Sequence, residues 1–262
     1  VFGGSTVFSI LVKDEDTFCY KLQKKLNNSI LVKKLNKKFK VINMGQPGNV
    51  ILNQLLNYLL FAENTSPDIV ISHFGAGDLH TGQCSDASLL NNYNITYNDI
   101  CEVWAKKIHN SNHEIDPDLN NEKNANFKPV TSKNNPSSIV KSCYERLTQF
   151  KSIVERKNAK FIGGFQSWIY SKEKLSQNEK DKLKNYYKYY QKIYSNIPTL
   201  CELFKNEIIS KNNNDFILDL HSSFKNLDSN ISHFGDVVHT LEPGDEKIAD
   251  EYFNKILNLY EN

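Results

Sequence analysis

The sequence predicts an α/β fold in which a mostly parallel five-stranded sheet is covered by helices on both faces. Short apolar runs alternate with longer segments whose apolar residues recur at helical spacing. Turns rich in glycine or proline follow several of the apolar runs. This repeating order requires parallel strands joined by right-handed helical crossovers. Because sites in such sheets gather at the carboxyl ends of the strands, we expect the chemistry to lie in these turns.

The first strand is expected at Val1–Phe2, which runs straight into Gly3-Gly4-Ser5-Thr6. Two glycines permit a tight turn, and a serine on such a turn can point its hydroxyl outward. A helix should follow the acidic residues that begin at Asp14, because carboxylates favour a helix start. The apolar residues of this helix recur at helical spacing: Phe18, Leu22 and Leu26.

Strand, turn and helix then repeat along the chain. Phe39–Ile42 is predicted to be a short buried strand, and its glycines and proline make Asn43–Gly48 a loop. Asn49–Leu60 is strongly apolar at helical spacing and is predicted to be a helix. Asp68–Phe74 is the next predicted strand, and it ends in the loop Gly75–Asp78.

The regular order breaks between His80 and Pro136. This stretch is rich in asparagine and too long for a plain loop, so we expect a functional insert or a lid. Ser137–Asn158 is a predicted helix with one apolar face, and Ala159–Phe165 is the fourth strand.

A second insert, mostly helical, is expected at Lys172–Ser210. Its cluster of tyrosines could form a binding face, but an amphipathic helix that packs their rings is favoured: Tyr186, Tyr187, Tyr189, Tyr190 and Tyr194. Phe216–Leu220 is the fifth predicted strand, and Glu246–Leu259 is the closing helix. Neither internal repeats nor a domain boundary stand out, so residues 1–262 are expected to form one domain.

Composition excludes several classes of protein. Of the 262 residues, 39% are hydrophobic and 24% are charged, which suits a globular domain with a sizeable core. The net charge of +2, with Arg146 and Arg156 as the only arginines, gives no case for a nucleic-acid partner. No run is long and apolar enough to span a membrane. The sequence does not indicate an oligomeric state.

The cysteines favour a reducing compartment. There are five, widely spaced, without a CxxC pair and with one left over, which is typical of free thiols. We therefore expect a cytoplasmic address. The chain starts on Val1-Phe2, which looks like the end of a strand, so a trimmed leader or anchor leaves a cell-envelope or secreted address open.

A candidate catalytic pair follows the fifth strand. Asp236 and His239 stand three residues apart, and a carboxylate and an imidazole held this way can act as orienter and general base. The pair then needs a nucleophile, for which Ser5 is the candidate. A lone turn serine is usually structural, and so is a lone histidine near a helix start. Their combination with Asp236 favours catalysis.

Four separate stretches together resemble the sequence blocks of the SGNH (GDSL-type) hydrolase superfamily. They are Gly3-Gly4-Ser5-Thr6, Asn43–Gly48, Gly75-Ala76-Gly77-Asp78 and Asp236-Val237-Val238-His239. The blocks stand in the family's order and extend over nearly the whole chain. The resemblance implies a flavodoxin-like three-layer α/β/α sandwich. It also implies an esterase, a lipase, a carbohydrate deacetylase or an O-acyltransferase.

The resemblance assigns roles by position. Ser5 matches the nucleophile, and Asp236 and His239 match the other two members of the triad. The backbone N–H groups of Ser5 and Gly45 match donors of the oxyanion hole. One position departs from the family. The third block normally carries an asparagine whose amide binds the oxyanion, but Gly77 occupies that position here and has no side chain.

The expected function is therefore a serine esterase that forms an acyl-enzyme and needs no metal or organic cofactor. A small-molecule or glycan ester is the expected partner, with a short acyl group on a carbohydrate favoured by family analogy alone. Two alternatives remain open. One is an O-acyltransferase with the same triad, and the other is a catalytically impaired relative that binds a glycan or a protein.

The remaining histidines suggest no second site. His73 lies within a predicted strand and is expected to be packed and hydrogen-bonded. His221 and His233 flank the last strand and the last block, but their spacing matches no zinc-binding pattern.

Overall fold

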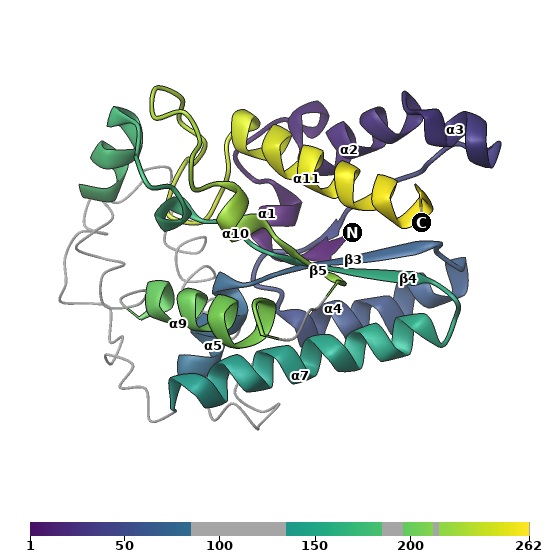
Figure 1. The fold of residues 1–262 in the computed structure, drawn as a ribbon, viewed down its shortest axis with the longest axis horizontal. Helices are drawn as coiled ribbons and strands as arrows, with labels where there is room; N and C mark the ends of the chain where they lie inside the picture. Colours follow the sequence, from purple (N-terminus) through teal and green to yellow (C-terminus); the bar gives the residue numbers. More distant parts are fainter. Residues whose placement is uncertain (85–134, 185–195, 212–214, 262) are drawn as a thin grey trace, which may run out of the picture.

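The computed structural model describes residues 1–84, 135–184, 196–211 and 215–261 (Figure 1). Within these residues five strands form one sheet in which every pair is parallel, in the order β2-β1-β3-β4-β5. The strands are β1 (Phe2–Gly3), β2 (Met44–Gly45), β3 (Ile69–Phe74), β4 (Lys160–Phe165) and β5 (Ile217–Asp219). This is the flavodoxin-like strand order, in which the direction of winding reverses between β1 and β3.

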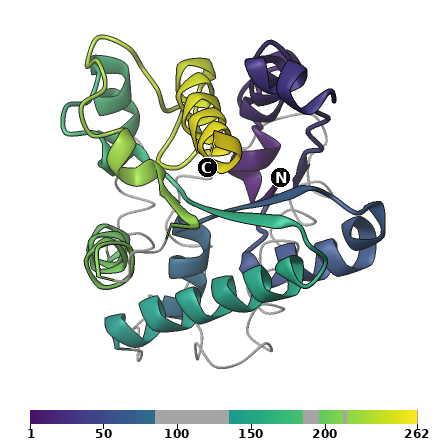
Figure 2. The same cartoon turned by 45° about the vertical axis from the view of Figure 1, so that its right-hand side comes forward.

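Helices cover both faces of the sheet, which gives the three layers seen in Figures 1 and 2. One layer contains α2 (Phe18–Asn27), α3 (Ile30–Leu35) and α11 (Glu242–Glu261). The opposite layer contains α4 (Ile51–Asn57), α5 (Ala76–Cys84), α7 (Pro136–Glu155) and α9 (Ile197–Phe204). The predicted α/β/α sandwich is confirmed, and its sheet is wholly parallel within the described residues.

Short helical pieces complete the described chain. Two are single-turn α-helices, α1 (Ser5–Phe8) and α10 (Leu220–Ser223). Three are 3₁₀ turns, at Asp14–Asp16, Glu63–Thr65 and Ile169–Ser171. Two are π-helical turns that extend α4 and α9, at Tyr58–Ala62 and Lys205–Ile209. Residues 177–184 are also helical.

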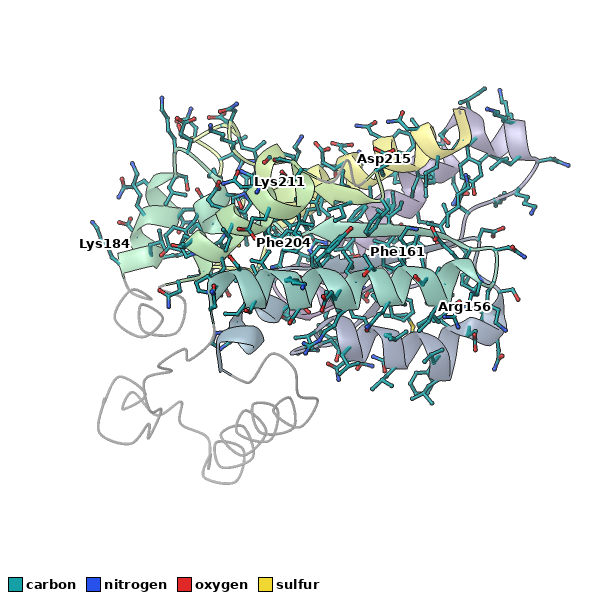
Figure 3. The ribbon with its side chains drawn as sticks, turned by 60° about the horizontal axis from the view of Figure 1, so that its bottom comes forward. Arg156, Phe161, Lys184, Phe204, Lys211 and Asp215 are labelled. Atoms are coloured by element: carbon teal, nitrogen blue, oxygen red, sulfur yellow. The ribbon has the colours of Figure 1, made fainter. Side chains whose placement is uncertain are left out.

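The sheet is buried on both faces by aromatic side chains. On one face Phe165 stacks on Phe204 of α9, with ring centroids 4.7 Å apart. Figure 3 shows Phe161 and Phe204 inside the molecule, whereas Lys184 and Lys211 lie at its surface. On the other face His73 is buried, and its Nδ1 lies 2.9 Å from the hydroxyl of Tyr252. Its predicted packed and hydrogen-bonded state is confirmed.

The predicted strand at Phe39–Ile42 is wrong, because these residues precede the sheet and β2 begins at Met44. Side chains of α2 bind the backbone here in place of a neighbouring strand. The amide of Phe39 donates to the side chain of Asn27 (2.8 Å), and the amide of Val41 donates to that of Gln23 (2.8 Å). Backbone pairing beside β1 starts at Ile42, whose carbonyl accepts the backbone nitrogen of Val1 (2.8 Å), and at Met44, whose amide donates to the carbonyl of Val1 (2.8 Å).

Other boundaries also differ from expectation. The stretch predicted as a loop at Gly75–Asp78 already contains the first turn of α5, and α11 begins four residues before the expected Glu246. Most of the insert expected at residues 80–136 and the tyrosine cluster at 186–194 lie outside the described residues. None of the described helices combines the length and apolar character that crossing a membrane requires.

Candidate active site

Ser5 stands at the point where β1 turns into α1. It is the first residue of that helix, and extended Gly4 precedes it as the N-cap. The turn has no room for a side chain at Gly3 and little room for one at Gly4. A Cβ on Gly3 would lie 2.2 Å from Cγ2 of Val7, and one on Gly4 would lie 3.2 Å from the carbonyl oxygen of Asn49. The two glycines therefore allow a sharp strand-to-helix turn that carries the serine.

Ser5, His239 and Asp236 form one chain of hydrogen bonds. Oγ of Ser5 lies 2.7 Å from Nε2 of His239, and Nδ1 of His239 lies 2.6 Å from Oδ2 of Asp236. The other carboxylate oxygen, Oδ1, accepts the backbone N–H groups of Val238 and His239, each at 2.8 Å. The structure thus brings together the three residues that the sequence singled out, across a separation of 234 residues.

The electrostatics of this chain suit proton transfer from the serine. Desolvation raises the pKa of Asp236, but hydrogen bonds from the His239 side chain and from two backbone amides outweigh it, so the pKa lies below its ordinary value. Asp236 is therefore ionised at neutral pH and accepts a proton-bearing Nδ1. In a neutral imidazole this leaves Nε2 as an acceptor, facing the hydroxyl of Ser5.

The loop that carries Asp236 and His239 is a narrow hairpin, residues 233–241. The amide of Gly235 donates to the carbonyl of His239, and the amide of Leu241 donates to the carbonyl of His233, both at 2.8 Å. A third bond joins the loop to the segment after β4, where the amide of Ile169 donates to the carbonyl of Val237 (2.9 Å). The backbone beside both side chains is therefore held from several directions.

Gly45 lies against α1, the helix that begins at Ser5, but its N–H is already bound. It donates to Oδ1 of Asn43 (2.8 Å), and Nδ2 of the same asparagine donates to the carbonyl of Val7 (2.8 Å). A Cβ on Gly45 would lie only 2.3 Å from the amide nitrogen of Phe8, so glycine is needed for this close approach. The predicted oxyanion role of Gly45 would require its N–H to leave Asn43.

Gly77 stands exposed in the first turn of α5, and a Cβ built there would meet no atom within 4 Å. Packing therefore does not impose a glycine at this position. The following residue, Asp78, has a structural role that the sequence did not reveal. Its carboxylate accepts the N–H of Ile51 (2.7 Å) and that of Gly75 (3.1 Å), which ties the start of α4 to the end of β3.

A buried ion pair at the base of the hairpin was also missed. The side chains of Lys172 and Glu179 are fully buried, and Nζ lies 2.8 Å from Oε2. Oε1 of Glu179 accepts the backbone N–H groups of His233 (2.8 Å) and Phe234 (3.2 Å), so this carboxylate fixes the start of the hairpin. Both residues belong to a lysine-rich stretch, where such charges ordinarily face the solvent.

No set of three histidine, cysteine, aspartate or glutamate side chains in the described parts of the chain is arranged to hold a metal ion. His221 stacks against Phe165 with ring centroids 5.9 Å apart. His233 faces the ammonium group of Lys172, with Nδ1 and Nζ 3.2 Å apart. The packing of each ring is thus accounted for by protein neighbours.

Comparisons with known proteins agree with this architecture. No family model and no curated protein matches the sequence. Among solved structures, Axe2, an acetylxylan esterase from Geobacillus stearothermophilus, is 12% identical with a TM-score of 0.52, covering 97% of this chain and 91% of its own. LAE5, an α/β hydrolase enzyme from the metagenome of Lake Arreo, Spain, is 12% identical with a TM-score of 0.52, and the match covers 97% of this chain and 92% of LAE5. A putative lipolytic protein of the G-D-S-L family from Desulfitobacterium hafniense DCB-2 is 11% identical with a TM-score of 0.50, and the match covers 97% of this chain and 96% of that protein.

At such low identity these likenesses establish the fold. The chain has the fold of the SGNH (GDSL-type) hydrolases, and the resemblance predicted from the four sequence blocks is confirmed at that level. The blocks around Ser5 and Gly75–Asp78 follow β1 and β3, the strands between which the winding reverses. That position is where open α/β sheets place their ligands.

Proposed function

We propose that the protein is a serine esterase of the SGNH type that works through an acyl-enzyme. The observation that carries this proposal is the unbroken chain from the hydroxyl of Ser5 through the imidazole of His239 to the carboxylate of Asp236. A serine hydroxyl is a weak nucleophile unless a base beside it takes its proton. The 2.7 Å contact provides that base, and Asp236 holds it in the required tautomer.

The reaction has two balanced halves. In the first, Nε2 of His239 takes the Ser5 proton while Oγ attacks the ester carbonyl carbon, and Asp236 stabilises the imidazolium that forms. The tetrahedral intermediate then expels the alcohol, which receives that proton from His239. In the second half His239 activates a water molecule, which attacks the acyl-enzyme, and Ser5 regains its proton as the acid leaves.

The developing oxyanion needs hydrogen-bond donors. Ser5 is the first residue of α1, so its N–H has no acceptor within the helix and is one proposed donor. Gly45 is the second, provided that its N–H is released from Asn43. Gly77 cannot supply the side-chain donor of the family. Loss of one such donor costs roughly 2.7–4 kcal/mol, or about 10²–10³ in rate, so slow but measurable turnover is expected.

For the substrate we propose a short acyl group on a carbohydrate. The support is indirect, since Axe2 is described as an acetylxylan esterase and shares the fold. An O-acyltransferase would use the same triad and differ only in resolving the acyl-enzyme with an acceptor hydroxyl in place of water. An intact Ser5–His239 contact favours either reaction over a purely binding role.

The decisive experiment compares the wild type with Ser5→Ala and with a control, Ser152→Ala, at an exposed position of α7. We expect the wild type and the control to hydrolyse p-nitrophenyl acetate and to be labelled once by a fluorophosphonate. Ser5→Ala should lose at least about 10³-fold in kcat and all labelling. Esters of increasing chain length and an acetylated xylo-oligosaccharide then define the substrate. Unchanged turnover in Ser5→Ala would refute the nucleophile assignment.

A further inference from the structure

The edge of the sheet that carries Ser5 offers one further hydrogen-bond donor, the side-chain amide of Gln166. This residue directly follows β4, and its backbone N–H donates to the carbonyl of Phe74 at 2.7 Å, which continues the pairing of β3 with β4. Only 8% of Gln166 is exposed. Its side-chain amide makes no hydrogen bond with another residue in the described parts of the chain. A nearly buried amide without a protein partner needs an explanation, and a bound substrate supplies one.

The register of the sheet places Gln166 level with Ser5. Ser5, Gly75 and Gln166 each stand three residues after one paired row of the sheet, which consists of Phe2, Ser72 and Gly163. Neighbouring strands lie about 4.8 Å apart, so β1 and β4 are separated by roughly 10 Å at this level. An extended glutamine side chain reaches roughly 5 Å from its Cα. The remaining distance accommodates the Ser5 hydroxyl and a substrate carbonyl.

Gly75 keeps the space between these two residues open. It directly follows β3, the strand that lies between β1 and β4. A Cβ built on Gly75 would lie 3.0 Å from the Cβ of Gln166, so a side chain there would crowd the glutamine. Other amides beside Ser5 are already engaged, because those of Asn43 and Asn49 donate to protein acceptors at 2.8 Å and 3.2 Å. Gln166 is therefore the amide best placed to meet a substrate.

We propose that the side-chain amide of Gln166 is the third donor of the oxyanion hole, in place of the asparagine amide that position 77 lacks. The inference rests on the proposed esterase function. When Oγ of Ser5 attacks an ester, the carbonyl oxygen gains negative charge, and the Gln166 amide donates to it beside the backbone N–H of Ser5. Because Gln166 is nearly buried, water competes little for this bond, which strengthens as the charge develops. Turnover should therefore exceed what backbone donors alone allow.

The test begins with Gln166→Met, which keeps the length of the side chain but removes its amide. The matched control is Gln177→Met, at an exposed position in another segment. Three quantities are measured: kcat and KM for p-nitrophenyl acetate, the rate of Ser5 labelling by a fluorophosphonate, and the melting temperature. We expect Gln166→Met to lower kcat and the labelling rate about 10²-fold with KM nearly unchanged, because one oxyanion donor is lost. The control should stay within about twofold of the wild type.

A rescue experiment separates the loss of a donor from damage to packing. Gly77→Asn places an amide at the family's position, where a Cβ meets no atom within 4 Å. Combined with Gln166→Met it should recover at least about tenfold in kcat, whereas the same change in the wild type should gain less. An amide on α5 would not repair packing around Gln166. Equal gains in the two backgrounds would overturn the inference, because the two amides would then not serve the same oxygen.

Gln166→Glu decides the matter if Gln166→Met does not fold, because it keeps the shape of the side chain and places a carboxylate where the oxyanion forms. At neutral pH it should lower kcat by at least about 10²-fold. Wild-type labelling rates in folded Gln166→Met or Gln166→Glu would overturn the inference while leaving the esterase proposal intact. A wild type that is not labelled at Ser5 would instead overturn the esterase proposal.

Discussion

Replacing Glu179 with alanine should be among the most damaging single changes away from the triad. The variant leaves the Lys172 ammonium buried without its carboxylate, and it removes the acceptor of three backbone N–H groups, those of Ser176, His233 and Phe234. Breaking a buried ion pair from one side typically costs about 3–5 kcal/mol. Native domains have only about 5–15 kcal/mol in total, so Glu179→Ala should be marginally stable.

Equilibrium unfolding in urea, followed by circular dichroism, measures this loss. At roughly 2–4 °C per kcal/mol for a chain of comparable size, the melting temperature should fall by about 6–20 °C. Two controls sharpen the interpretation. Glu145→Ala breaks a solvent-exposed pair with Lys141 and should cost less than about 1 kcal/mol. Lys172→Met combined with Glu179→Leu removes both charges at similar volume and should cost less than Glu179→Ala alone.

The reasoning fails if Glu179→Ala is no more destabilising than Glu145→Ala, because the burial of the pair would then carry no energetic consequence. It also fails if the double variant is less stable than Glu179→Ala. In that case the loss would come from the orphaned backbone amides of the hairpin and not from the unpaired ammonium of Lys172.

Three further predictions concern the active-site edge. Asp236→Ala should lower kcat less than Ser5→Ala does, because in the proposed mechanism Asp236 orients the base and does not react. The kcat of Asp236→Ala should exceed that of Ser5→Ala by a factor of about 10–100, and equal losses in the two variants would contradict this. Gly77→Asn should raise kcat up to about tenfold with little change in KM, since a Cβ there meets no atom within 4 Å and the family that the sequence resembles has its oxyanion-binding amide at this position. Gly77→Ala is the control, because it adds a Cβ without an amide. A fall in kcat in a folded Gly77→Asn would contradict the inference that the space beside Gly77 is open to a side chain. Burial raises the pKa of Asp78 to about 6, so between about pH 4 and 6 the folded protein binds a proton that the unfolded chain has lost. The free energy of unfolding should therefore fall with rising pH in that window. The fall should be steeper in the wild type than in Asp78→Asn, by up to about 1.4 kcal/mol per pH unit. Equal slopes in the two proteins would refute the shifted pKa of Asp78.

The layers of the fold could be predicted from the sequence because the pattern of its strands and the pattern of its helices agree. β3 and β4 are apolar over their buried lengths, and the helices between strands show one apolar face. Its error at Phe39–Ile42 has a specific cause. The side chains of Gln23 and Asn27 bind the backbone there, and no local pattern reveals that a strand's partner will be replaced by side-chain amides.

The candidate site was predictable as far as it depends on residue type and order. Ser5, Asp236 and His239 could be found because each follows a predicted strand. The bonds that hold them could not be found. Whether the Gly45 N–H faces a substrate or Asn43 depends on one side-chain orientation. The burial of Glu179 depends on segments far apart in sequence, and its charge alone predicts the opposite.

The separation of Ser5 and His239 by 234 positions in the sequence has a consequence for how the protein is made. At about 5–20 residues per second, a ribosome adds the base roughly ten to fifty seconds after the nucleophile. During that interval the nascent chain carries a serine with no imidazole beside it, which is chemically inert. In the proposed mechanism the hydroxyl becomes reactive only when the hairpin docks on the sheet edge. Return of esterase activity after denaturation should therefore lag behind the return of secondary structure, and that lag measures the joining of two distant parts of the chain.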